Sequence, residues 1–463
     1  MTYNKAAHDI LASDDDGKNG SDSLASEYSL DSLLDKVELL GGGFWCGPDA
    51  ETYTDDKAED DTAPRTLRSF TAFIHILKGN IGPGILALPL NFLHVGTLAG
   101  CACMGVVICH GLIGMVLLLR IQRYVEARYS LTRPLSFEEI GSYLLGDAGK
   151  CAVQTSVCAL QFGVCTVFIS LISANTLQLI GQENVSRSVV VSMVAVVCGG
   201  LSLLPDLESL WSLQLFGNVV MLTTSGSILV AAVGCLISGP EHKPGPTPEG
   251  TLMTYMSFIA VCFYAFEGVA LVLPIRNQLR PESAKSYKAI LVSGMTLVAT
   301  LFVTIGSFGG IAFPDNEKAS ITVYLASHYE KGSAASKYFV TLNGMVALAV
   351  LFTFPLQLAP AALVVDRMLE LSSTFSRVAA RLSAVVICTS LVLLIPTLEM
   401  LIDLIGAVAT TSLASLPYVF HARLRLTYDR QLFFRDYLLL AVDSLAISLC
   451  ALVAIAGVKN AVG

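Results

Sequence analysis

The residues with the clearest potential for chemistry lie where glycine and proline interrupt the first long apolar run. Residues 75–89 read H-I-L-K-G-N-I-G-P-G-I-L-A-L-P. Because backbone N–H and C=O groups in hydrocarbon need partners, an irregular segment is tolerated only where it is buried in protein or lines a cavity. A helix broken there presents N–H groups at one half-helix end and carbonyls at the other, which can bind a carboxylate and a cation. The segment predicts a transporter site for a small zwitterion, formed by Asn80, Ile81, Gly82 and Gly84.

A second interruption carries a carboxylate into the middle of another apolar run, residues 258–274. A charged side chain at mid-membrane costs at least ~2.5 kcal/mol, so Glu267 is a candidate functional residue. The alternative is a structural carboxylate, either neutral or hydrogen-bonded to freed backbone N–H groups. Carbonyls released by this break can bind an amine. The substrate-binding residues predicted here are Phe263, Ala265, Phe266 and Gly268, the two phenylalanine rings serving as pocket walls or as core packing.

Two ionisable residues at these interruptions are candidates for coupling transport to protons. His75 precedes the first break, and an imidazole takes and releases a proton near neutral pH. Glu267 supplies a carboxylate at the second break. We predict that both residues move the coupling proton, the alternative for His75 being a packed or interfacial histidine.

The elements that position these residues are membrane helices. The chain has 463 residues, of which 54% are hydrophobic and only 14% charged, whereas soluble proteins average about 25% charged residues. Apolar runs of roughly 20 residues recur from Phe70 to Val458, which predicts an all-α polytopic membrane protein. We expect about eleven spans, at residues 70–93, 97–119, 151–180, 187–204, 211–237, 251–275, 288–313, 338–365, 382–398, 400–420 and 436–458.

The two interruptions fall in spans 1 and 6 of this series, five spans apart. An odd offset means that the second copy crosses the membrane in the opposite sense, as expected of an inverted five-plus-five repeat with its site between the broken helices. The loops that share a side with the N-terminus contain sixteen Lys and Arg residues, against six on the other side. This bias predicts a cytosolic N-terminus.

The predicted domains are an acidic tail, residues 1–64, and a transmembrane domain, residues 65–463. The tail holds sixteen acidic and four basic residues, and we expect it to be disordered and cytosolic. It contains an acidic di-leucine pattern, Asp35 with Leu39 and Leu40, of the kind that sorting adaptors of endosomes, lysosomes and vacuoles read. The alternative for this pattern is a short amphipathic segment.

Several ordered motifs resemble the amino acid/auxin permease superfamily, within it most closely the proton-coupled and vacuolar neutral amino acid transporters. The resemblance covers about residues 66–458, and its motifs are His75 to Gly82 with Gly84, Phe263 to Gly268, Ser320 to Thr322, Leu351 to Gln357 and Asp403 to Val408. It implies a LeuT-type core of ten helices with an eleventh span. It also recommends Thr353 as an ion or substrate ligand, although the hydroxyl can instead bond a carbonyl of its own helix. Pro83 departs from the family, in which a small hydroxyl residue is common, and removes one N–H donor.

We therefore expect a secondary active transporter for small neutral amino acids that works by alternating access, coupled to protons or, as in some relatives, to sodium. The vacuolar or lysosomal membrane is favoured over the plasma membrane. The alternative is a membrane amino acid sensor that signals through its tail. No H-E-x-x-H motif and no His/Asp cluster at ligand spacing is present, so we expect neither an enzyme nor a metal site or cofactor. The expected partners are the amino acid, the bilayer and a sorting adaptor, and nucleic acid is not among them.

Overall fold

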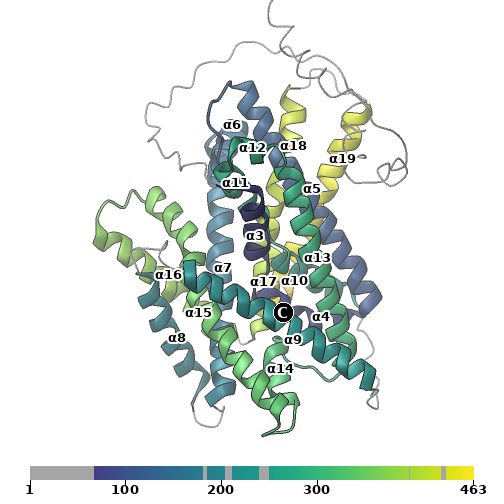
Figure 1. Ribbon diagram of the computed structural model, residues 1–463. Coiled ribbons are helices and arrows are strands. Elements are labelled where there is room, and N and C mark those ends of the chain that lie inside the picture. The colour runs from purple at the N-terminus through teal and green to yellow at the C-terminus, as the bar shows by residue number, and fades with distance from the viewer. Residues whose placement is uncertain are drawn as a thin grey trace, which may run out of the picture. The chain divides into compact units, whose positions relative to one another are not determined.

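The described part of the computed structural model consists of helices joined by short connections (Figure 1). It comprises residues 67–180, 185–203, 211–238, 250–395, 397–428 and 434–462. In these ranges the only pairing of extended backbone is an isolated bridge between Leu67 and Leu279. The predicted acidic tail and its di-leucine pattern lie outside the described residues, and both stay predictions.

The helices occur at the positions of the predicted spans. Nine in the described ranges are long and apolar enough to cross a membrane, or ten with one bent pair counted as a span, and the shorter apolar helix α8 lies at the remaining position. In chain order they are α3 (Ser69–Asn80) with η1 (Pro83–Ala87) and α4 (Leu88–Val95), α5 (Thr97–Arg128), α7 (Asp147–Ile180), α8 (Arg187–Ser202), α9 (Trp211–Ser238), α10 (Leu252–Ala265) with α11 (Val269–Gln278), α13 (Tyr287–Ala312), α15 (Ala334–Met368), α16 (Thr374–Leu394), α17 (Leu398–Ile405) with η3 (Gly406–Thr410) and α18 (Thr411–Tyr428), and α19 (Phe434–Val462).

Some helices are longer than the apolar runs that predicted them. α5 continues to Arg128, nine residues past the predicted end at residue 119, and α16 begins at Thr374 rather than at residue 382. The extra turns contain arginine, which ends an apolar run but favours helix as well as leucine does. The hydropathy of the sequence thus marks where a helix leaves the hydrocarbon, not where the helix ends.

Two short helices display the inverted relation between the halves of the chain. α6 (Phe137–Leu145) follows the second span of the first half, and α14 (Ile321–His328) follows the second span of the second half. Figure 1 shows them at opposite ends of the helices. A capping box begins α6: Ser136 Oγ accepts the Glu139 N–H, and the Glu139 side chain accepts the Ser136 N–H.

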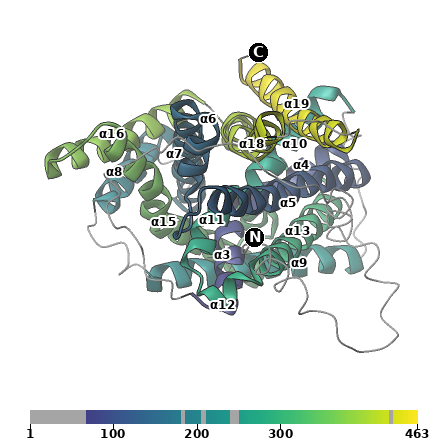
Figure 2. The ribbon, with the colours of Figure 1, turned by 90° about the horizontal axis from the view of Figure 1, so that it is seen from above.

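The helices form two groups. Figure 2 shows α7, α8, α15 and α16 together on one side and α3, α5 and α13 on the other. α7 and α15 are joined by side-chain amides, among them Asn343 Nδ2, which donates to Gln178 Oε1 at 2.6 Å, and Gln357, which donates to Gln161. Interhelical bonds of this kind hold membrane helices together where the hydrophobic effect between them is absent. The group of α7, α8, α15 and α16 therefore forms a scaffold beside the broken helices.

Backbone and side-chain bonds tie the two broken helices together at the end that carries α6. The Leu67 N–H donates to the Gln278 carbonyl at 3.0 Å, and the Arg280 N–H donates to the Leu67 carbonyl at 3.1 Å. Arg276, at the end of α11, donates to both carboxylate oxygens of Glu126 in α5, at 3.1 and 3.3 Å. The start of α3 and the end of α11 are therefore held at one level, which fixes the register of the two breaks.

Candidate binding site at the two broken helices

The first break separates α3 from η1 and α4, and its two parts are bent by 43°. α3 ends at Asn80; Gly82 is extended (φ −118°, ψ −172°), and Pro83 begins the 3₁₀ turn η1. The proline cannot continue the α3 hydrogen-bond pattern because it lacks an N–H group. The predicted break in span 1 is thus confirmed, with its irregular backbone at Ile81 and Gly82.

The second break separates α10 from α11. α10 ends at Ala265, and α11 begins at Val269 after Gly268. The last carbonyls of a helix have no partner within it, so those of residues 263 to 265 point past the end of α10. The predicted break in span 6 is therefore confirmed as well.

The two breaks touch each other at two glycines. A Cβ built on Gly84 would lie 3.0 Å from the Ala265 Cα and 3.4 Å from the Tyr264 ring. A Cβ built on Gly268 would lie 2.8 Å from Asn80 Oδ1 and 2.7 Å from the methyl of Met115. At Gly84 the neighbour is the backbone of α10, which would have to shift for a side chain, whereas at Gly268 the neighbours are the ends of three side chains. The N–H end of one half-helix and the carbonyl end of the other are thereby brought to one place.

Asn80 has an unused acceptor in this contact. Its Nδ2 donates to the Ile76 carbonyl one turn back at 2.8 Å, and its Oδ1 is buried with no hydrogen-bond partner among the described residues. Leaving a buried acceptor unsatisfied costs about 1–3 kcal/mol. Ile81 is buried beside it, and Gly82 has no atom within 4 Å of where a Cβ would be. An oxygen acceptor, a backbone turn and open space therefore adjoin one another.

Glu267 fixes the start of α11. Its Oε1 accepts the Ala270 N–H at 3.1 Å, and the side chain is half-buried. A carboxylate at a helix N-terminus satisfies free N–H groups and interacts favourably with the helix dipole. This contact corresponds to the structural alternative weighed from the sequence, and the role of Glu267 in proton coupling stays a prediction.

The two phenylalanines of the second break pack against α5. The Phe263 ring centroid lies 5.2 Å from that of His110, and Phe266 lies against Gly111, where a built Cβ would be 3.1 Å from the ring. Both rings are buried. They form an apolar wall behind the carbonyl end of α10, and the side chains that a substrate touches stay a prediction.

His75 lies away from this contact. The face of α3 that enters the protein carries Ala72, Ile76 and Asn80, whereas His75 is on the exposed face. The structure therefore does not bring His75 and Glu267 together, and a shared role for them in coupling stays a prediction.

Thr353 forms a hydrogen bond within its own helix. Its hydroxyl donates to the Ala349 carbonyl at 2.8 Å, at the turn that precedes Pro355, and it faces Gly217 of α9. The hydroxyl proton is thus engaged within the helix while the oxygen keeps its lone pairs, and the role of Thr353 as an ion or substrate ligand stays a prediction.

We expect Thr353→Val to lower amino acid uptake only slightly, by less than about fivefold, since a net intrahelical hydrogen bond is worth about 1 kcal/mol. Thr353→Ser, which keeps the hydroxyl, is the control and should match the wild type. Uptake assays of the three proteins check this. A large loss in the valine variant alone would show that the hydroxyl binds the substrate or an ion.

Three features of the site were not predicted from the sequence. Tyr264 lies between the two breaks and span 10, Met295 packs on Gly268, and span 10 contains the π-helical segment η3. A Cβ on Gly406, at the start of η3, would overlap the Ala260 carbonyl oxygen of α10. Tyr264 and Gly406 both lie in motifs quoted above, but their closeness to the breaks depends on packing between helices, which the motifs do not report.

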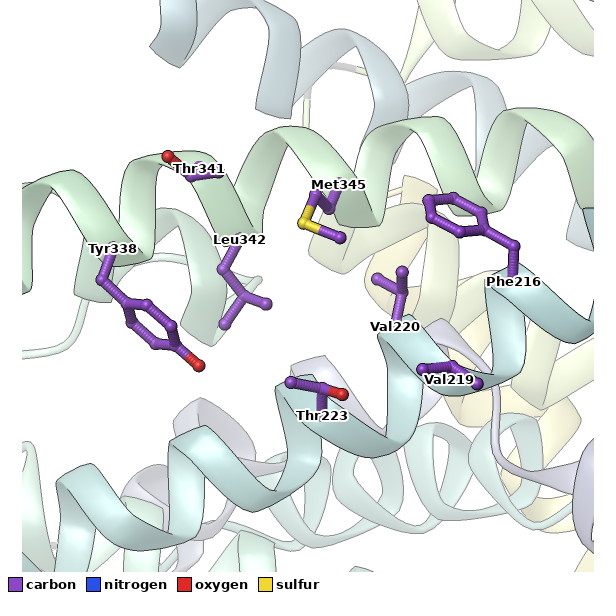
Figure 3. A pocket seen from close by; sticks show the side chains of 8 residues that line it. All are labelled: Phe216, Val219, Val220, Thr223, Tyr338, Thr341, Leu342 and Met345. Atoms are coloured by element: carbon purple, nitrogen blue, oxygen red, sulfur yellow. The ribbon is translucent and has the colours of Figure 1, made fainter.

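A separate cavity of about 170 Å³ lies between α9 and α15 (Figure 3). Leu342 and Met345 of α15 face Val220 and Thr223 of α9 across it. Its lining is almost entirely apolar, and none of the predicted site residues contributes to it. In the described residues, no three His, Cys, Asp or Glu side chains are grouped so that they can hold a metal ion. The broken helices therefore remain the candidate site.

Comparison with known proteins gives consistent relatives and folds. Residues 65–458 match the family model described as transmembrane amino acid transporter protein. Amino acid transporter AVT3A of Arabidopsis thaliana is 27% identical over 408 residues, covering 86% of this chain and 90% of the relative. AVT3B of the same plant is 26% identical over 385 residues, covering 79% of this chain and 88% of the relative.

Two solved transporters share the arrangement of helices. Mhp1 in its inward-facing conformation superposes with a TM-score of 0.59, at 12% identity, over 87% of this chain and 92% of the other. MhsT in complex with L-phenylalanine gives a TM-score of 0.53, at 13% identity, over 83% of this chain and 98% of the other. These likenesses confirm the predicted LeuT-type fold.

Proposed function

The chain belongs to the family of transmembrane amino acid transporter proteins, and from this membership we propose that it moves small neutral amino acids across a membrane, coupled to protons, by alternating access. Membership and fold establish a multi-pass amino acid transporter rather than an enzyme. The size of the substrate and the coupling ion are the parts that we propose.

The contact between the two breaks is the observation that carries this proposal. The substrate carboxylate meets the backbone N–H of Gly84 at the start of η1, where the half-helix end is electropositive. The ammonium group meets Asn80 Oδ1 and the carbonyls at the end of α10. Phe263 and Phe266 supply apolar walls and no charge, which suits an uncharged side chain. Pro83 offers no N–H, and the N–H groups of Ile81 and Gly82 donate to the Leu77 and Asn80 carbonyls, so the Gly84 N–H is the donor left to hold the carboxylate.

Proton coupling is proposed through Glu267 and His75. Glu267 lies just before the start of α11, in direct contact with the break, so its protonation changes the hydrogen bond that it accepts from the Ala270 N–H. His75 lies on the same half-helix as Asn80, on its exposed face. Sodium is the alternative coupling ion.

Uptake of radiolabelled alanine, proline, leucine and glutamate into proteoliposomes tests the function, with and without an inside-alkaline pH gradient. We expect the gradient to stimulate uptake of neutral amino acids, with glutamate uptake unchanged. Stimulation by a sodium gradient alone would replace protons by sodium. Binding in a thermal-shift assay without any flux would favour the sensor alternative.

We expect Glu267→Gln to reduce gradient-stimulated uptake at least about tenfold, because glutamine keeps an acceptor for the Ala270 N–H but cannot exchange a proton at this pH. His75→Ala should reduce the stimulation as well. Glu282→Gln, at an exposed carboxylate of α12 (Pro281–Ala284), is the control. Unchanged pH dependence in both His75→Ala and Glu267→Gln would refute their role in coupling.

The proposed location is the vacuolar or lysosomal membrane, with a cytosolic N-terminus. The di-leucine pattern at Asp35, Leu39 and Leu40 supports this proposal through a sorting adaptor. Replacing both leucines by alanine should shift the protein to the plasma membrane, as followed by fluorescence microscopy of a tagged chain.

Deleting residues 1–60 should leave transport intact, whereas a sensor would lose its signal and keep substrate binding.

A further inference from the structure

A line of ionisable side chains runs along the contact between the last two membrane helices. We name it the α18–α19 seam and define it as Tyr418, His421 and Arg425 of α18 with Asp436, Asp443 and Cys450 of α19. On each helix these positions are three, four or seven residues apart, so they share one face. The seam begins at the end of the protein that carries α6, because Arg423 of α18 donates to the Leu144 carbonyl of α6.

The seam contains a continuous set of polar contacts. Arg425 Nη1 donates to Asp436 Oδ1 at 2.6 Å. The Nε of the same arginine lies 3.5 Å from His421 Nε2, and His421 Nδ1 lies 2.7 Å from Asp443 Oδ2. These distances fit a neutral His421 that donates from Nδ1 to Asp443 and accepts from Arg425 at Nε2. The four side chains then carry two negative charges and one positive charge.

The Asp443 carboxylate is buried within an apolar helix, where an ionisable side chain is costly. It is 2% exposed, within a helix whose other faces are exposed and apolar, such as Leu445 and Leu452. It lies seven residues from Asp436, or about 10 Å further along the helix. Ionisable residues inside membrane segments are costly and mark ion or proton pathways. An apolar residue would anchor a peripheral helix at no such cost.

The seam extends to the wall of the substrate site through His110 of α5. The Tyr418 hydroxyl donates to the His110 carbonyl at 2.6 Å, and Cys450 Sγ lies 3.5 Å from His110 Nε2. His110 is 6% exposed, and its Nδ1 has no hydrogen-bond partner among the described residues. The His110 ring also makes a T-shaped contact with Phe263, two residues from the end of α10. A buried histidine with an open nitrogen thus connects the seam to the second break.

We propose that the α18–α19 seam and His110 form a proton-binding site of this transporter, in addition to Glu267 and His75. This inference rests on the proposed coupling to protons. A proton from water at the end that carries α6 binds His421 Nε2 and replaces the hydrogen bond from Arg425, which keeps its bond to Asp436. An N–H bond forms at His421 as an O–H bond of hydronium breaks, and the charge of the four side chains falls to zero. Release of that proton breaks the same N–H bond and returns the proton to water. His110 Nδ1 exchanges a proton with water beside the substrate site in the same way, by making and breaking one N–H bond.

Among the groups around the seam, His421 is the histidine that contacts a seam carboxylate, that of Asp443. α5 contributes His110 and Cys109, and α10 contributes the apolar ring of Phe263. The Asp403 carbonyl of α17 lies 3.8 Å from a Cβ built on Gly457 of α19, and Asp403 Oδ2 accepts the Ser257 hydroxyl. Arg423 is directed toward α6. Arg425 and Asp443 are the charged side chains that contact the His421 ring.

Two assays on proteoliposomes separate proton coupling from the rest of the transport cycle. The first measures uptake of the neutral amino acid that the wild type takes up best, with and without a pH gradient. The second measures counterflow of the same amino acid at equal pH, which needs substrate binding and alternating access but no net movement of protons. The variants are Asp443→Asn and His421→Gln, with Asp443→Glu as the conservative variant. The control is His94→Gln, at an exposed histidine of α4 paired with Glu399.

We expect Asp443→Asn and His421→Gln to lose most of the stimulation by the pH gradient and to retain counterflow, and Asp443→Glu to recover stimulation. Stimulation equal to that of the wild type in both variants would overturn the proposal, as would equal loss of stimulation and counterflow. A wild type that ignores the pH gradient would instead refute the proposed coupling itself. If Asp443→Asn fails to fold, as judged by size-exclusion chromatography, His421→Gln and His110→Gln test the proposal in the same two assays. Both should then lose stimulation by the pH gradient and retain counterflow.

Discussion

Replacing Asn80 by leucine is expected to reduce amino acid uptake at least about tenfold and to leave thermal stability unchanged or raised. Asn80 Oδ1 is buried without a partner, at a cost of about 1–3 kcal/mol to the folded protein. Leucine shares the branching of asparagine at Cγ, although it is larger, and removes that cost together with the bond from Asn80 Nδ2 to the Ile76 carbonyl. A substrate ammonium loses a charge-assisted acceptor, and each ~1.4 kcal/mol lost corresponds to tenfold in affinity.

Asn91 of α4 supplies a matched control for this variant. It is buried to the same degree as Asn80, both being 5% exposed, and its Nδ2 also donates to a carbonyl one turn back, that of Ala87. Its Oδ1, however, is not among the buried acceptors that lack a partner in the described residues. Asn91→Leu should therefore not raise stability, and it should keep substrate affinity. Stability is measured by thermal unfolding in detergent, and affinity by the substrate concentration that half-saturates uptake.

A different outcome would assign Asn80 to the fold. If Asn80→Leu lowered the unfolding temperature and uptake together, as a core defect does, the unused acceptor would have a structural partner such as water. Gain in stability with loss of function is the expected mark of a residue kept for binding.

The breaks themselves could be predicted from the sequence because glycine and proline interrupt an apolar helix by local chemistry. Pro83 lacks an N–H group and Gly268 lacks a Cβ atom, and both properties are local to the residue, so they do not depend on neighbouring helices. The apolar runs and the offset of five spans then gave the helix order and the inverted repeat. These parts of the fold depend on composition and spacing alone.

The partners of the site residues could not be predicted because they depend on packing between distant helices. The sequence placed Glu267 beside Gly268, but only the structure shows its carboxylate on the Ala270 N–H. His75 appeared favourable for its position near the break, and its face of α3 turned out to be exposed. His110 lies in an apolar run without a motif, and its importance rests on Tyr418 and Cys450, more than 300 residues away.

Replacing Gly84 by valine is expected to abolish transport, because this glycine brings η1 onto the end of α10. A Cβ at this position would already lie 3.0 Å from the Ala265 Cα and 3.3 Å from its Cβ. Valine adds two methyl groups against a backbone that cannot rotate away, and overpacking of this kind costs about 1–3 kcal/mol. The two breaks must separate, so the carboxylate and ammonium sites no longer fit one amino acid.

Gly82, two residues earlier in the same break, is the control position, because it adjoins open space instead of a closely packed helix. No atom lies within 4 Å of a Cβ built there, and its φ of −118° is accessible to any residue. Gly82→Ala should therefore leave thermal stability unchanged, whereas Gly84→Val lowers it. If the space beside Gly82 holds the substrate, alanine raises the concentration that half-saturates uptake without altering the unfolding temperature. Equal stability of the two variants would show that the breaks do not depend on the contact at Gly84, and the binding site would then have to lie elsewhere along α3 and α10.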